Sequence, residues 1–160
     1  MKRLLPVALL AAACGNSSTP ANVAGSYTVA VTNEGNGCNF QNWQSGNTAS
    51  NIPVTVTQSG ANATAVVGGA AGAYMTAVLG SNAFSGPVNG AQVDLTLYGT
   101  RSASQGNCAY TVNATMLATS MGDFLSGTIT YTAATNGSPD CGALQGCQSI
   151  QDFNGTRPPM

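Results

Sequence analysis

The strongest constraint on the fold of this chain is a period-two alternation of threonine with aliphatic or aromatic residues. The segments 27–32 and 52–57 show it clearly, and such alternation is typical of β-strands that bury one face. Turn residues separate successive segments, and Asn89-Gly90 is the strongest hairpin signal among them. The pattern predicts eight strands, at 27–32, 52–57, 61–67, 84–88, 92–99, 110–116, 124–133 and 149–156.

Eight consecutive strands of this kind predict an all-β fold. We expect an eight-stranded antiparallel up-and-down meander that closes as a small barrel, because open sheet edges promote aggregation. A two-sheet β-sandwich is the alternative architecture. The segment 68–81 is left open between a ninth strand and a short helical turn.

The alternation also indicates which side chains point into the fold. None of these side chains is charged, so the interior is either a filled apolar core or a cavity for a lipid-like ligand. The short strands favour a filled core slightly. The expected inward-facing residues are Tyr27, Val29, Val31, Ile52, Val54, Val56, Phe84, Val88, Val93, Leu95, Leu97, Tyr110, Val112, Met116, Leu125, Ile129 and Tyr131.

The connections between the expected strands alternate in length. Even-numbered connections are tight turns, and odd-numbered connections are long. In a meander all odd-numbered connections emerge at one end, so the cysteines after residue 14 and the sole tryptophan should lie there. Long loops at one end of a rigid scaffold are typical of binding proteins. We therefore take Trp43, Tyr74 and Arg101 as candidate binding-loop residues.

Four cysteines follow residue 14, at Cys38, Cys108, Cys141 and Cys147. An even number of cysteines in a secreted chain predicts two disulfides formed in an oxidising compartment. Sequence alone leaves three pairings open. In one of them, Cys141–Cys147 would close a small loop and Cys38–Cys108 would join distant segments. No two cysteines have the spacing of a zinc knuckle, and the chain has no histidine. We therefore expect no metal site.

Charge and residue types exclude several functions. Only 6% of the residues are charged, and the formal net charge is −1, so no basic patch can form for nucleic acid. Without histidine, a catalytic triad with an imidazole base is impossible. The acidic residues are scattered and form no recognisable acid–base pair. We expect a protein without enzymatic activity and without a cofactor.

The amino-terminal segment carries a targeting pattern. A basic start, Lys2-Arg3, precedes an apolar run too short to cross a bilayer, which requires about 20 residues. This is the pattern of a secretory signal peptide. The run ends in Ala11-Ala12-Ala13-Cys14, which resembles the lipobox of bacterial lipoproteins, although Ala11 stands where that family usually has leucine. The resemblance implies cleavage before Cys14 and acylation of that cysteine, for which palmitate is a suitable label.

These patterns divide the chain into four parts. Residues 1–13 are the expected lipoprotein signal peptide, 14–23 the lipidated cysteine and tether, 24–157 the β domain and 158–160 a tail. Two acyl chains are enough for stable membrane anchoring. Gly15 follows the cysteine in place of an aspartate, and the lipoprotein resemblance associates that pattern with the outer membrane. We therefore expect a lipid-anchored outer-membrane protein.

A second resemblance concerns the barrel itself. Gly25-Ser26-Tyr27 opens the first expected strand, and Asn154-Gly155-Thr156-Arg157 ends the last. These segments resemble the calycin group, lipocalins and avidins, in which Gly-x-Trp opens the first strand and an arginine packs over the tryptophan ring. Here Tyr27 replaces the tryptophan. The resemblance implies a barrel with a closed N-terminal end and an open mouth. An exposed Arg157 beside the proline-containing tail is the alternative.

Together, these expectations favour a membrane-anchored extracytoplasmic lipoprotein without enzymatic activity. Its partners would be the membrane, through the lipid, and an apolar small molecule or an envelope protein at the loop-rich end. The alternative is a structural or passive envelope lipoprotein without a specific ligand, because a neutral surface gives little electrostatic steering. Since the tether is short, we expect the four cysteines and the long loops at the opposite end, facing away from the membrane.

Overall fold

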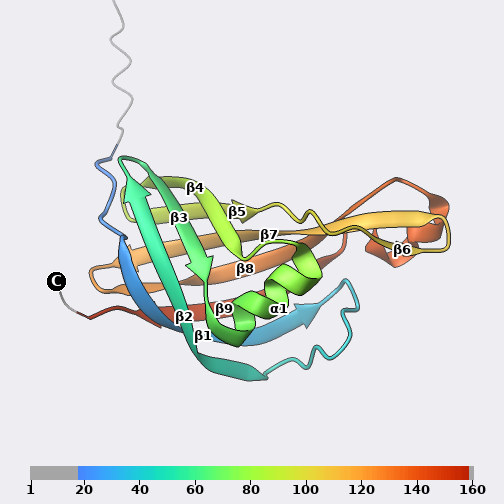
Figure 1. Ribbon diagram of the computed structural model, residues 1–160, viewed down its shortest axis with the longest axis horizontal. Helices are drawn as coiled ribbons and strands as arrows, with labels where there is room; N and C mark the ends of the chain where they lie inside the picture. The colour runs from blue at the N-terminus through green and yellow to red at the C-terminus, as the bar shows by residue number, and fades with distance from the viewer. Residues whose placement is uncertain (1–17, 159–160) are drawn as a thin grey trace, which may run out of the picture.

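The computed structural model describes residues 18–158, so the expected signal peptide and Cys14 lie outside the described range. Within that range the chain forms nine strands, one α-helix and one 3₁₀ helix (Figure 1). In chain order these elements are β1 (Gly25–Asn36), β2 (Thr48–Ser59), β3 (Asn62–Val67), α1 (Gly69–Leu79), β4 (Ala83–Asn89), β5 (Gln92–Leu97), β6 (Ala103–Gln105), β7 (Cys108–Met121), β8 (Phe124–Thr135), η1 (Pro139–Leu144) and β9 (Gln148–Thr156).

Eight of these strands form a closed barrel. Each pairs antiparallel with the next, β5 pairs with β7, and β9 returns to pair with β1. The expected eight-stranded up-and-down barrel is therefore confirmed, and the two-sheet sandwich is not formed. The additional strand, β6, is three residues long and pairs with the start of β7, beyond the end of β5.

The two ends of the barrel differ in their connections. The end that carries the tight turns at Gly60, Gly90 and Gly122 is called the closed end below, and both ends of the described chain lie there (Figure 1). The other end carries α1, β6, η1 and the connection from β1 to β2; it is called the open end. The four paired cysteines lie at the open end, as the lengths of the connections predicted.

Several strands are longer than the alternation predicted. β1 continues to Asn36 across an irregularity between Val29 and Val31, and β7 and β8 are 14 and 12 residues long. The residues from Asn33 to Asn36 therefore belong to the barrel wall rather than to the first long loop. The expectation of short strands is wrong, and the longer walls leave room for an interior space.

The segment 68–81 forms helix α1 and not a ninth barrel strand. Its carboxyl end is set by Gly80, which has a left-handed φ of 85° and whose N–H donates to the Thr76 carbonyl oxygen. Ala71, Met75 and Leu79 recur at four-residue spacing and pack against the core. The helix therefore lines the mouth of the barrel with one apolar face.

Two disulfides form, as expected, and the structure decides between the three pairings that the sequence left open. Cys38 bonds to Cys147 and Cys108 to Cys141, so the pairs Cys141–Cys147 and Cys38–Cys108 are not formed. The reason is that η1 packs against β7, which carries Cys141 to the first residue of that strand. The chain then leads into β9 beside the end of β1, which brings Cys147 next to Cys38.

Candidate functional site: the barrel cavity

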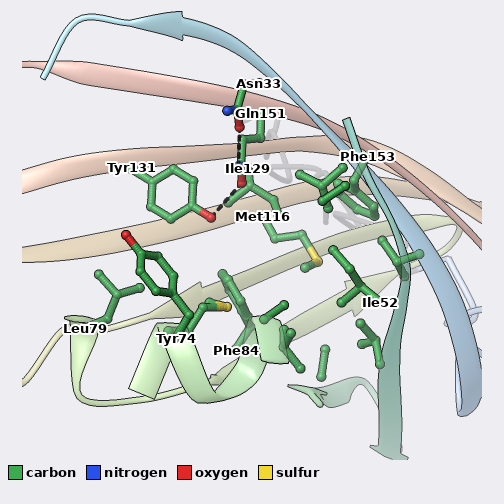
Figure 2. A pocket seen from close by; sticks show the side chains of 18 of the residues that line it. Asn33, Ile52, Tyr74, Leu79, Phe84, Met116, Ile129, Tyr131, Gln151 and Phe153 are labelled. Carbon is green, nitrogen blue, oxygen red and sulfur yellow. Dashed lines mark hydrogen bonds between the residues drawn. The ribbon is translucent and has the colours of Figure 1, made fainter. Parts of the chain in front are cut away.

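The barrel encloses an apolar cavity. The inward-facing residues expected from the alternation are all buried or packed against the core. Between them remains a cavity of about 1040 Å³, lined by residues of the barrel strands and of α1 (Figure 2). Residues of the β1–β2 connection also line it. The expectation of a filled core is therefore wrong.

The base of the barrel is sealed by a buried cation. Arg157, which directly follows β9, is 7% exposed, and its guanidinium lies 5.6 Å from the centre of the Tyr27 ring. Its Nε–H donates to Asp123 Oδ1 at 3.1 Å. Its Nη1 group donates to the Ala24 carbonyl oxygen, and its Nη2 group to the carbonyl oxygens of Asn22 and Gly122. The alternative of an exposed Arg157 is wrong.

The ring of Tyr27 is fixed in the same contact. Its hydroxyl donates to the Val23 carbonyl oxygen at 3.1 Å, and burial raises the pKa of the Tyr27 phenol. An arginine near the last strand thus packs over an aromatic ring of the first strand, which is the contact that the calycin resemblance implies. The family relationship itself stays a prediction.

An aromatic cluster stands at the mouth. Phe40, Trp43 and Tyr131 lie with their ring centroids 6.0 to 6.3 Å apart, and Tyr131 meets the other two rings edge-on. The Trp43 indole N–H donates to the Glu34 carbonyl oxygen at 3.1 Å. The Asn36 side chain binds both backbone groups of Phe40. These bonds hold the β1–β2 connection against the cavity rim.

A short chain of hydrogen bonds runs along the cavity wall. Tyr131 Oη on β8 donates to Gln151 Oε1 on β9 at 2.8 Å, and Gln151 Nε2 donates to Asn33 Oδ1 on β1 at 2.7 Å (Figure 2). Burial raises the pKa of the Tyr131 phenol, with a smaller contribution from Tyr74. The phenol is therefore neutral, and a donor, at physiological pH. None of the described residues that line the cavity is charged.

Two of the three candidate binding-loop residues line the cavity. Trp43 does so from the β1–β2 connection and Tyr74 from α1, although the Tyr74 side chain is 65% exposed. Arg101 also lies at the open end, where its backbone N–H donates to the Leu79 carbonyl oxygen. Its exposed side chain is not part of the cavity wall. The expected lipidation site, Cys14, lies outside the described residues.

Sequence reasoning missed several residues of the wall. Asn33 continues the odd-numbered inward series of β1, and Gln151 and Phe153 form the same series on β9, so extending the alternation would have found them. Phe40 lies in a connection, where no periodic pattern identifies it. The inward amides were overlooked because alternation was followed only through apolar residues.

Within residues 18–158, no three His, Cys, Asp or Glu side chains gather into a group suited to a metal ion. The helices of that range lack the length and apolar character that crossing a membrane requires. Comparisons with protein-family models, curated proteins and solved structures find no match to this chain.

Proposed function

We propose that this protein is a membrane-anchored extracytoplasmic lipoprotein whose barrel binds a small apolar ligand without enzymatic conversion. The observation that carries the proposal is the apolar cavity of about 1040 Å³. Ligand pockets usually measure roughly 300–1,000 Å³. An empty apolar cavity lowers stability, because its walls lose packing contacts. A barrel that keeps one at this size is best explained by an occupant.

The surroundings of the cavity suit ligand binding. Apolar surface that leaves water on binding contributes roughly 25 cal/mol per Å². The wall is a closed ring of hydrogen-bonded strands whose open end carries two disulfides. Such a wall is largely organised before a ligand arrives, so little ordering entropy is lost on binding.

The same proposal places the lipid on Cys14 and the protein at the outer membrane. The described chain approaches the barrel at the closed end, where the Ala21 N–H donates to the Gly90 carbonyl oxygen at 2.8 Å and Val23 is fully buried. An anchor on this side tethers the closed end. The mouth, with Trp43 and Tyr74, then faces away from the membrane and is accessible to a ligand.

Binding of a neutral fluorescent probe, N-phenylnaphthylamine, tests the cavity. We expect the wild type to bind it with a Kd of about 1–10 µM, with energy transfer from Trp43, the only tryptophan of the chain. Ala65→Phe fills the cavity near its base and should weaken binding at least about tenfold. Ala65 is 2% exposed and lines the cavity.

Val66→Phe is the matched control, because Val66 is the next residue of β3 and is 39% exposed on the outer face. It should bind the probe like the wild type. A wild type that does not bind the probe, or equal binding by Ala65→Phe, would refute the cavity proposal.

Labelling with radioactive palmitate in the native host tests the anchor. The wild type should incorporate the label into the membrane fraction, and Cys14→Ser should abolish incorporation. Ser17→Ala, a nearby change that keeps the cysteine, should leave labelling intact. Labelling that survives Cys14→Ser contradicts the lipoprotein proposal.

A passive envelope lipoprotein remains the second candidate, favoured by the neutral, Thr- and Asn-rich surface. Native mass spectrometry of protein purified from its own host separates the two candidates. A carrier should retain an apolar molecule that Ala65→Phe excludes. A passive protein should have the mass of the acylated chain alone in both variants.

A further inference from the structure

The half of the cavity next to the closed end is apolar. Val56, Ala65, Phe84, Val93 and Leu125 line it, and each is at most 6% exposed. Below them Arg157 is covered by the Tyr27 ring and is not part of the cavity wall. The one hydroxyl in this part of the lining, that of Tyr27, already donates to the Val23 carbonyl oxygen, so a polar group at this depth would lose its water and gain few partners, which is unfavourable in apolar surroundings. This half suits a hydrocarbon chain or ring.

The half next to the mouth contains the chain Tyr131–Gln151–Asn33 in its wall (Figure 2). In these two hydrogen bonds the Tyr131 hydroxyl donates its proton, and Gln151 Nε2 donates one of its two protons. By the ordinary bonding capacity of these groups, the Tyr131 oxygen still accepts, and the Gln151 and Asn33 amide nitrogens still donate. The chain therefore offers both a donor and an acceptor to a ligand oxygen.

Charge is missing throughout the wall. The cavity lining that the structure describes contains amides, one threonine, tyrosines and the Trp43 indole as its polar side chains, and no cation. Arg157 is the nearest buried cation, and its donors are taken by Asp123 and by backbone oxygens. A carboxylate or phosphate in the cavity would be desolvated without a counter-charge, which is strongly unfavourable.

Building on the proposed function, we propose that the ligand is a neutral amphiphile. Its hydrocarbon part fills the base, and an uncharged hydroxyl, ester or amide oxygen binds to Tyr131, Gln151 and Asn33. Fatty-acid anions and other charged lipids are selected against. Tyr131 and its two partners thus act as specificity-determining residues, because they form hydrogen bonds with a ligand oxygen that lies at a fixed distance from the base of the cavity.

Competition against N-phenylnaphthylamine tests this selectivity. Dodecanol and dodecanoate share one hydrocarbon chain and differ in charge at about pH 8, where the acid is ionised. Dodecanol should displace the probe from the wild type at an at least tenfold lower concentration than dodecanoate, about 1.4 kcal/mol. Equal or tighter binding of dodecanoate would overturn the inference.

Tyr131→Phe tests whether the hydrogen-bond chain supplies the selectivity. It removes one hydroxyl and keeps the ring in the aromatic cluster, so its effect is measured as the ratio of dodecanol affinity to probe affinity, which cancels any general change in the cavity. Dodecanol should bind at least about fivefold more weakly. Gln151→Leu should have the same effect from the neighbouring strand. Tyr98→Phe is the matched control, because Tyr98 is 72% exposed outside the barrel.

The outcomes distinguish a failure of the proposed cavity function from a failure of the proposed selectivity. A wild type that binds neither the probe nor dodecanol refutes the cavity function and the selectivity together. Probe binding with unchanged dodecanol affinity in Tyr131→Phe and Gln151→Leu refutes the selectivity alone. Retained probe binding by these variants shows that a loss of dodecanol affinity does not come from misfolding.

Discussion

The closed and open ends of this barrel are held by different forces. At the closed end, tight turns with left-handed glycines and the buried Arg157 fix the chain through hydrogen bonds and one ion pair. At the open end, two disulfides fix long connections. Short turns lose little entropy on folding, whereas long connections lose more and gain more from covalent restraint. Polar contacts thus hold the tight turns of the closed end, whereas covalent bonds hold the long connections of the open end.

The difference matches the proposed roles of the two ends. The closed end must exclude water from the base of the cavity, and Arg157 with Tyr27 does so with a buried contact. The open end must admit a ligand, so it cannot be closed by a packed core. Disulfides stabilise such a rim without filling it. Matched changes at the two ends should therefore have unequal effects.

Removal of one disulfide at a time should give the largest effects. The Cys38–Cys147 bond joins residues 109 positions apart and the Cys108–Cys141 bond residues 33 apart. The chain-entropy relation gives losses of roughly 5 and roughly 4 kcal/mol, respectively. Urea unfolding of the two double-alanine variants measures both. A larger loss for the shorter loop would show that local contacts of η1, not chain entropy, dominate.

Arg157→Ala should lower the free energy of unfolding by about 3 kcal/mol, since it leaves backbone carbonyl oxygens without donors and removes the contact with the Tyr27 ring. Arg101→Ala, the same change at the open end, should stay within about 0.5 kcal/mol because the side chain is exposed. Urea unfolding compares the two variants. Similar losses would contradict the role assigned to the closed-end cation.

A glycine-to-alanine change at each end sharpens the comparison. Gly60 and Gly80 both have positive φ values, so each variant should lose about 1 kcal/mol from backbone strain. At Gly80 a Cβ would also lie 2.2 Å from Thr100 Oγ1, whereas at Gly60 it meets nothing within 4 Å. Gly80→Ala should therefore lose about 1 kcal/mol more. Thermal unfolding of both variants measures the difference.

Alkaline pH should act on the two buried tyrosines unequally. Burial raises the pKa of both phenols, but at Tyr27 the nearby Arg157 opposes the shift, and the shift at Tyr131 is the larger one. Above about pH 10 the unfolded chain releases these protons before the folded one does. The contribution of these two phenols to the free energy of unfolding is therefore fully present below that pH. It falls above that pH, by at most about 1.4 kcal/mol per pH unit for each group.

Unfolding measured between about pH 8 and pH 11 checks this slope. Tyr131→Phe should flatten the alkaline loss of stability more than Tyr27→Phe does. The reverse order would mean that the closed-end tyrosine is the more strongly perturbed of the two.

Much of the barrel follows from local patterns. Alternation identifies the inward face of each strand, and the alternating lengths of the connections put the cysteines at one end. Both inferences use only neighbouring residues, because an antiparallel meander joins each strand to the next in sequence. That is why the strand number and the sidedness of the loops were predictable without any long-range information.

The cavity and the disulfide pairing depend on distances that local patterns do not contain. The volume inside the barrel depends on how far β1, β7 and β8 extend, and strand ends are set by cross-strand pairing. The partner of Cys141 depends on where η1 packs. The amides of Asn33 and Gln151 were missed because polar residues on an inward face break the expected apolar series.

The pairing of β1 with β9 has a consequence for how the protein is made. Cys38 bonds to the last cysteine of the chain rather than to the next one, and the Cys108–Cys141 bond is nested inside that span. Cys108 is synthesised long before Cys147, so if the thiols oxidise in that order, Cys38 is first joined to a non-native partner. Thiol–disulfide exchange must then replace that bond. An oxidant alone therefore does not ensure the native pairing of this barrel.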